Sequence, residues 1–139
     1  MAYSITEACT GCTACARICP VGAIHGERKA LHVVDMKTCI ECGACGRVCN
    51  FKAVLEPSGH LAQGLKKEEW LKPVWNYALC VECNICVQVC PTSVIAHAGA
   101  NSTVEGVQPN QPVLANARNC IGCSFCARDC PTEAIVMQA

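Results

Sequence analysis

Cysteine is the residue type in this chain that could do chemistry, and its spacing is regular. All 16 cysteines of the 139 residues fall into four runs with the spacing C-x2-C-x2-C-x3-C. In chain order, motifs 1 to 4 comprise Cys9, Cys12, Cys15 and Cys19; Cys39, Cys42, Cys45 and Cys49; Cys80, Cys83, Cys86 and Cys90; and Cys120, Cys123, Cys126 and Cys130. Because thiolates bind soft metals and undergo redox reactions, this repeat indicates metal or redox chemistry.

So many cysteines in a short chain could also form a disulfide scaffold. Residues 1–7 show neither the basic start nor the apolar stretch of a secretion signal. No apolar run has the length of a membrane span. We therefore expect a cytoplasmic protein, in a reducing compartment where such spacing more often indicates metal. The 11 basic and 11 acidic residues balance, so charge gives no support to nucleic-acid or membrane-surface binding.

The spacing itself favours iron–sulfur clusters over zinc. Structural zinc sites use separated C-x2-C pairs around one tetrahedral ion. Here three closely spaced thiolates suit three corners of a cube-shaped cluster, and the fourth is free to serve elsewhere. The run C-x2-C-x2-C-x3-C-P is the bacterial iron–sulfur signature, whose fourth cysteine ligates the other cluster in two-cluster proteins. Proline completes it in three copies, as Pro20, Pro91 and Pro131, and Asn50 replaces it in motif 2.

The repeat includes packing residues as well as thiols. Four and five residues after each last cysteine stands an apolar pair: Ala23-Ile24, Ala53-Val54, Val94-Ile95 and Ala134-Ile135. One supersecondary element used four times is therefore expected. β-rich residues predict short strands at 3–5, 31–35, 53–55 and 113–115, and residues 16–19 fit one helical turn.

The chain resembles the bacterial-type ferredoxins with two four-iron clusters, over residues 1–56 and 78–137. The resemblance implies an α+β fold of two tandem ferredoxin-like units with crossed ligation and four [4Fe-4S] clusters. Carried over by residue, the implied ligand sets are Cys9, Cys12, Cys15 and Cys49 (site 1); Cys39, Cys42, Cys45 and Cys19 (site 2); Cys80, Cys83, Cys86 and Cys130 (site 3); and Cys120, Cys123, Cys126 and Cys90 (site 4).

These sets assume that neighbouring motifs pair. Four-cluster subunits of some molybdenum enzymes instead pair motif 1 with motif 4 and motif 2 with motif 3. Only 19 residues separate Cys19 from Cys39, as within a two-cluster ferredoxin, whereas 30 separate Cys49 from Cys80. We therefore favour sequential pairing.

The expected domains are a two-cluster unit at 1–56, a segment at 57–79 and a second two-cluster unit at 80–139. The middle segment holds a predicted short helix at 65–71 and both tryptophans, Trp70 and Trp75. It is interpreted as a linker whose aromatic residues fill the seam between the units, or as a docking surface for a partner.

Little else in the sequence suggests chemistry. We interpret His25, His32, His60 and His97 as surface or strand residues rather than ligands. Asn50 is interpreted as a turn variation, with an altered first cluster as the alternative. The glycosylation pattern Asn101-Ser102-Thr103 is taken as chance in a chain without an export signal.

Electron transfer is the function that these features predict, with no catalytic residues of its own. The favoured interpretation is an iron–sulfur subunit of an oxidoreductase complex, since size and layout resemble subunits beside tungsten aldehyde oxidoreductases or benzoyl-CoA reductases. Its partners would be a tungsten- or molybdenum-pterin catalytic subunit, and a flavin subunit or soluble ferredoxin. The alternatives are a freely diffusing polyferredoxin and, from another class, a redox or iron sensor, which would not need four clusters.

Overall fold

The chain divides into two compact units, and each is built on the same plan. The computed structural model describes residues 2–99 and 105–139, so the pattern Asn101-Ser102-Thr103 lies outside the described residues. Unit 1 comprises Met1–Trp70 and unit 2 comprises Leu71–Ala139. Each contains two motifs, as sequential pairing of neighbouring motifs requires.

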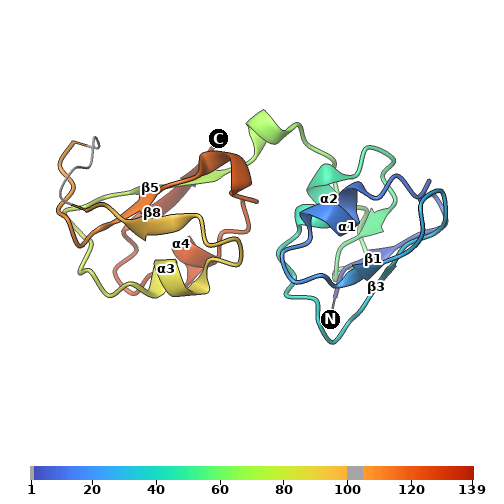
Figure 1. The fold of residues 1–139 in the computed structure, drawn as a ribbon, viewed down its shortest axis with the longest axis horizontal. Helices are drawn as coiled ribbons and strands as arrows, with labels where there is room; N and C mark the ends of the chain where they lie inside the picture. The colour runs from blue at the N-terminus through green and yellow to red at the C-terminus, as the bar shows by residue number, and fades with distance from the viewer. Residues whose placement is uncertain (1, 100–104) are drawn as a thin grey trace. The chain divides into compact units, whose positions relative to one another are not determined.

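Unit 1 alternates short strands with one-turn helices (Figure 1). In order these are β1 (Ser4–Ile5), α1 (Ala14–Ile18), β2 (Ile24–His25), β3 (Val33–Val34), α2 (Ala44–Val48), β4 (Val54–Leu55) and the 3₁₀ turn η1 (Lys67–Glu69). The outer strands β1 and β4 pair antiparallel, and β2 pairs with β3 as a hairpin. The predicted strands at 3–5, 31–35 and 53–55 are thereby confirmed, with narrower limits.

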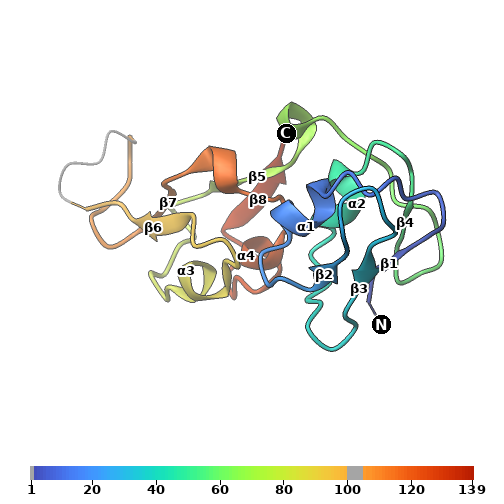
Figure 2. The same cartoon turned by 45° about the vertical axis from the view of Figure 1, so that its right-hand side comes forward.

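Unit 2 repeats this order of strands and α-helices. It contains β5 (Lys72–Trp75), α3 (Ile85–Val89), β6 (Ile95–His97), β7 (Pro112–Leu114), the 3₁₀ turn η2 (Ala117–Asn119), α4 (Phe125–Arg128) and β8 (Ile135–Gln138). Strands β5 and β8 pair antiparallel, as do β6 and β7, both visible in Figure 2. The strand predicted at 113–115 is confirmed as β7. The small α+β fold confirms what the resemblance to two-cluster ferredoxins implied.

Each helix is short because the motif itself limits it. All four begin just before the third cysteine of a motif and end before or beside the fourth. An isolated helix of four or five residues is unstable in water. These helices are instead held by packing, α1 against α2 and α3 against α4.

The cores are small and contain much sulfur. In unit 1 the buried cluster comprises Cys15, Ala23, Ile24, Val34, Cys45, Val54 and Ala62. In unit 2 it comprises Cys86, Val94, Ile95, Cys120, Cys126 and Ile135. All eight residues of the apolar pairs are buried, so their predicted packing role is confirmed.

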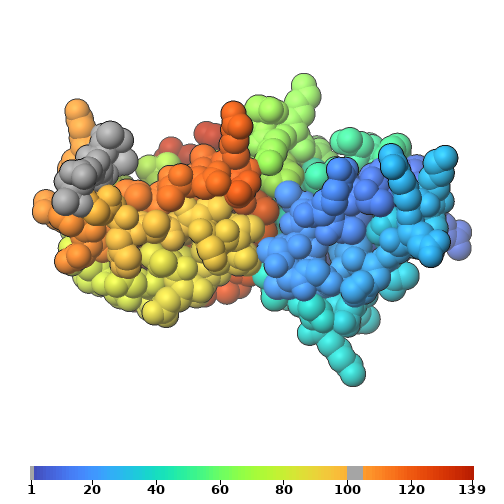
Figure 3. Space-filling model, in the orientation of Figure 1, coloured from blue at the N-terminus to red at the C-terminus, as the bar shows by residue number. Residues whose placement is uncertain are grey.

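Residues 57–79, expected as a separate linker or docking segment, are divided between the units. The helix expected at 65–71 is only the exposed turn η1, coloured light green in Figure 3. Trp70 is 2% exposed, and its indole N–H donates to the Leu65 carbonyl at 3.2 Å. Trp75 lies in β5, opposite Ile135 of β8. Pairing with β8 satisfies backbone hydrogen-bonding groups of β5. The sequence pattern alone did not predict this strand.

Candidate iron–sulfur sites

The four cysteine loops share one backbone conformation. In every motif the residues on either side of the second cysteine have φ between +58° and +76°. A third left-handed residue stands three positions after the last cysteine, at Gly22, Lys52, Ser93 and Glu133. Loops that contain left-handed residues can direct neighbouring backbone N–H groups into one concavity, which suits anions.

Backbone N–H groups already bond to the thiols. The last cysteine of each motif accepts a hydrogen bond from the N–H four residues later, at 3.3 to 3.5 Å. Those donors are Ala23, Ala53, Val94 and Ala134, the first residues of the apolar pairs. One apolar pair therefore packs the core and also orients a thiol.

At site 3 the structure gathers cysteines from two motifs around one hollow. Its walls include Cys80, Cys83 and Cys86 of motif 3 together with Cys130 of motif 4. The remaining walls are Trp75, Val81, Glu82, Asn84, Pro112, Thr132 and Ala134. A loop of motif 3 and the last cysteine of motif 4 thus face the same space.

The hollow at site 4 is its counterpart in unit 2. Cys120, Cys123 and Cys126 line it together with Cys90 of motif 3. Pro73, Ile95, Ile121 and Met137 supply apolar wall. In unit 2 the last cysteine of each motif therefore lines the same hollow as the first three cysteines of the other motif.

Unit 1 has a corresponding hollow at site 2. It is lined by Cys39, Cys42, Cys45 and Cys19, with Tyr3 among the covering residues. The Cys19 thiol lies close enough to Cys42 to contribute to the raised pKa of Cys42, after the larger effect of burial.

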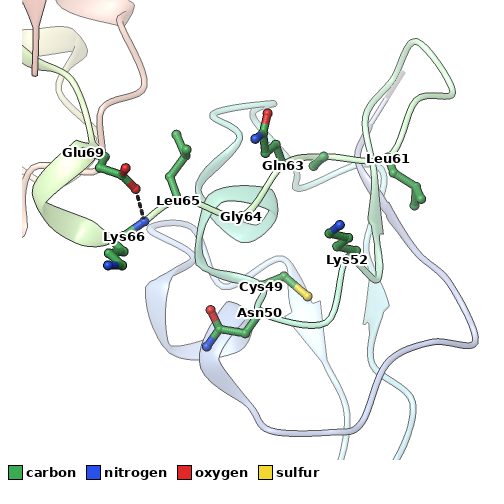
Figure 4. A pocket seen from close by; sticks show the side chains of 10 residues that line it. Cys49, Asn50, Lys52, Leu61, Gln63, Gly64, Leu65, Lys66 and Glu69 are labelled. Atoms are coloured by element: carbon green, nitrogen blue, oxygen red, sulfur yellow. Dashed lines mark hydrogen bonds between the residues drawn. The ribbon is translucent and has the colours of Figure 1, made fainter.

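The structure describes site 1 less directly than the other three. Cys49 packs against the core cluster that contains Cys15. Cys49 also lines an open groove of about 630 Å³ beside Asn50, Lys52 and Leu61 (Figure 4). The Cys12 thiol is exposed, as is that of Cys83 at the equivalent position of unit 2.

The groove is formed by the segment that follows β4. The Leu65 N–H donates to the Arg47 carbonyl at 2.9 Å. A Cβ on Gly64 would stand 2.5 Å from the Cys49 carbonyl oxygen. Residues 61–66 therefore lie directly against the backbone of Cys49. The Glu69 carboxylate accepts from the Lys66 N–H at 2.8 Å, at one end of the groove (Figure 4).

Burial and hydrogen bonding set the thiol pKa values in opposite directions. Burial raises the pKa of Cys45 and of Cys126 to about 12, and raises those of Cys15, Cys42 and Cys86 as well. At Cys90 and Cys130 burial acts the same way, but hydrogen bonds from the backbone and from a neighbouring threonine outweigh it and lower the pKa.

The arrangement of the thiols fits an iron–sulfur cluster. A metal-bound cysteine must lose its proton, so positive iron would have to compensate the charge of a buried thiolate such as that of Cys45. Among residues 2–99 and 105–139, no three His, Cys, Asp or Glu side chains converge on a point for a single metal ion. The thiols instead surround hollows with largely apolar walls. The donor set, four thiols and inward N–H groups, fits a [4Fe-4S] cluster.

Some residues at the sites were not identified from the sequence. Tyr3 covers site 2, while Trp75 and Pro112 cover site 3. For Trp75, the sequence signal that could have been used was its position in the repeat, because Trp75 in β5 and Ile5 in β1 occupy equivalent places.

The position of one histidine also differs from the expected surface or strand position. His32 is 1% exposed and immediately precedes β3. Its Nδ1 lies 3.0 Å from the Ala30 carbonyl oxygen.

Comparisons with known proteins agree with this chemistry. Three family models, each described as a 4Fe-4S dicluster domain, match residues 1–50, 35–94 and 79–135. The middle match spans motifs 2 and 3, which the structure assigns to different units. The family comparison therefore identifies the type of domain, while the structure groups motif 1 with motif 2 and motif 3 with motif 4.

Two known proteins are similar to this chain over part of their own length. A subunit of the ion-translocating oxidoreductase complex of Magnetococcus marinus is 56% identical over 34 residues, which are 24% of this chain and 19% of that protein. A chain of the formate dehydrogenase–heterodisulfide reductase–formylmethanofuran dehydrogenase complex of Methanospirillum hungatei is 26% identical with a TM-score of 0.38. That match covers 94% of this chain and 52% of the other. The matches thus span about a fifth of the first protein and about half of the second.

One further observation concerns membranes. Within residues 2–99 and 105–139, no helix has both the length and the apolar character that a membrane span requires.

Proposed function

Because the chain is built from ferredoxin-type 4Fe-4S dicluster domains, we propose that it transfers electrons through four [4Fe-4S] clusters, two in each unit. The observation that carries this proposal is the grouping of cysteines at sites 2, 3 and 4. Each hollow is lined by the first three cysteines of one motif and the last cysteine of its neighbour in the unit.

The proposed ligands are those of the crossed, sequential pattern. Cys39, Cys42, Cys45 and Cys19 would hold the cluster at site 2, with corresponding sets at sites 3 and 4. At site 1 the proposed ligands are Cys9, Cys12, Cys15 and Cys49. The support for site 1 is the repeat itself and the packing of Cys49 against the core cluster that contains Cys15.

A bound [4Fe-4S] cluster supplies one-electron chemistry. The chain's own residues hold it, exclude water from it and direct N–H groups toward its sulfur. With four thiolates at each site, no iron is left open for substrate, so the proposed role is electron transfer and not catalysis.

We further propose that the chain serves as the iron–sulfur subunit of a larger oxidoreductase complex. The support is its similarity over 34 residues to a subunit of an oxidoreductase complex. The catalytic partner proposed from size and layout is a tungsten- or molybdenum-pterin subunit, with a flavin subunit or soluble ferredoxin as the other electron partner. A freely diffusing carrier is the alternative.

Metal analysis of the anaerobically purified full chain tests the cofactor proposal. We expect about 16 iron and 16 acid-labile sulfide per chain, from four iron at each of four sites. Electron paramagnetic resonance (EPR) after reduction should show several interacting signals. If the chain bound only half of the expected iron, two of the four proposed sites would be unsupported. Zinc, or iron without sulfide, would overturn the proposal.

Anaerobic purification from the native source tests the subunit role. A partner chain at fixed stoichiometry, containing tungsten or molybdenum and a pterin, is the expected result. Recovery as a monomer that reduces several unrelated enzymes would instead establish the freely diffusing carrier.

A further inference from the structure

The indole of Trp75 places an unpaired N–H group at site 3. Trp75 lines the same hollow as Cys80, Cys83, Cys86 and Cys130. Its Nε1 is shielded from solvent and has no hydrogen-bond partner within residues 2–99 and 105–139. Leaving a buried donor unsatisfied is destabilising, so an acceptor is expected at this place.

The residues around the hollow indicate which acceptor. Three cysteines of motif 3 and Cys130 of motif 4 line it together with Trp75, so sulfur is the acceptor that site 3 offers to the indole N–H. The cross-strand pairing of Trp75 with Ile135 holds the ring in this position, and Ile135 is itself buried in the core.

The other tryptophan shows the contrasting case. Trp70 in unit 1 donates its indole N–H to the Leu65 carbonyl at 3.2 Å. Its donor is already satisfied by the backbone. Of the two indoles, only that of Trp75 is available to a bound group.

The repeat provides an internal comparison at site 1. The Thr6 N–H donates to the Ala53 carbonyl in unit 1, and the Asn76 N–H donates to the Ala134 carbonyl in unit 2, both at 2.7 Å. Ile5 and Trp75, one position earlier, are therefore equivalent. Ile5 has no side-chain donor, so site 1 lacks the N–H that Trp75 presents at site 3.

We propose that Trp75 donates its indole N–H to sulfur at site 3, either Cys86 Sγ or an adjacent cluster sulfide, and thereby raises the reduction potential of site 3. The inference rests on the proposed [4Fe-4S] binding. Reduction adds one electron and negative charge without breaking a bond, and Trp75 keeps its proton throughout. Hydrogen bonds to sulfur stabilise the more negative state more strongly and so raise the potential.

Trp75→Phe tests the proposal, because it keeps an aromatic ring and removes the donor. The full chain with its clusters would be titrated with dithionite in the presence of mediators, and each potential followed by EPR. We expect one of the four potentials to fall and three to stay, with about a tenfold change in the reduction equilibrium. For a one-electron couple this is about 59 mV.

Trp70→Phe is the matched control, since it removes the same group from a residue that does not line a site. It should leave all four potentials unchanged. If Trp75→Phe binds all its iron and sulfide but no potential falls, the inference is overturned while the proposed function stands. Absence of iron and sulfide from the unmodified chain would overturn the proposed function instead.

A spectroscopic measurement covers the case in which Trp75→Phe does not assemble. The chain would be labelled with tryptophan carrying ¹⁵N in the indole, and the reduced protein examined for ¹⁵N hyperfine coupling to a cluster. We expect a coupling that persists in labelled Trp70→Phe. A labelled chain without any such coupling would overturn the inference.

Discussion

At the scale of single residues, the repeated motif depends on backbone conformations that most side chains avoid. Eight non-glycine residues at the repeated positions of the four motifs have positive φ, among them Thr13, Glu82 and Asn84. Such conformations cost of order 1–3 kcal/mol each and persist only where the surroundings enforce them. Cluster binding would explain why these conformations persist, because they can direct backbone N–H groups toward the cluster site.

Gly11 is a position where glycine is required for two reasons. Its φ is +71°, and a Cβ would lie 2.3 Å from the Ala30 backbone nitrogen. The Lys29 N–H also donates to the Gly11 carbonyl at 2.9 Å, so the hairpin between β2 and β3 packs closely on this loop.

Gly11→Ala should therefore destabilise unit 1 strongly. Backbone strain and overpacking together should lower the unfolding free energy by about 2–4 kcal/mol. The midpoint of anaerobic thermal unfolding, followed by circular dichroism, should fall by at least about 8 °C.

Gly59→Ala is the control for strain alone, since Gly59 has a φ of +90° and nothing within 4 Å of an added Cβ. It should cost about 1 kcal/mol. If the unfolding midpoint fell equally in the two variants, the contact between Gly11 and the hairpin would contribute nothing to the loss of stability.

At the scale of elements, pairing of the outer strands makes the two motifs of a unit adjacent. In unit 1, Ile5 pairs with Val54. These strands stand just before motif 1 and just after motif 2, so the last cysteine of one motif is carried toward the loop of the other. This strand order is the arrangement that the proposed crossed ligation requires.

If the two motifs of unit 1 exchange their last cysteines as proposed, mutation of either cysteine should damage the cluster of the other motif. Cys19→Ala should damage the cluster of Cys39, Cys42 and Cys45, because Cys19 lines that hollow. Cys49→Ala should damage the cluster of Cys9, Cys12 and Cys15. Each loss should appear as a missing component in the EPR titration, with iron falling by up to about four per chain.

Each variant serves as the control for the other. Loss of the motif 2 cluster in Cys49→Ala, with the motif 1 cluster intact, would contradict crossed ligation. Damage reaching sites 3 and 4 would contradict the assignment of motifs to units.

At the scale of the whole molecule, the organic cores are too small to explain the fold alone. Units of about 70 residues bury limited apolar surface, and the strands here have two to four residues. Three of the six residues in the unit 2 core cluster are cysteines. Bound clusters would complete both cores, since ligand binding to the folded state stabilises it.

Removal of iron should therefore unfold both units. We expect treatment with a strong chelator under anaerobic conditions to abolish the dispersion of amide signals in nuclear magnetic resonance spectra. Reconstitution with iron and sulfide should restore it. An iron-free chain that keeps dispersed signals in both units would show that the protein core suffices.

The sequence alone determined the sulfur chemistry, because cysteine spacing is a local property. Three thiols at intervals of three residues fix which group they can bind, whatever surrounds them. The apolar pairs after each motif, and the strands at β1, β3, β4 and β7, were predictable for the same reason.

The tertiary structure alone decided which parts of the chain meet. Lys72–Trp75 looked like part of a linker because its four residues KPVW show no clear alternation, and only pairing with β8 makes it a strand. Whether motif 2 belongs with motif 1 or motif 3 depends on contacts distant in sequence, which local spacing does not encode. The position of Trp75 over site 3 follows from that same pairing. The sequence alone therefore could not indicate that its indole N–H lies at a cysteine site.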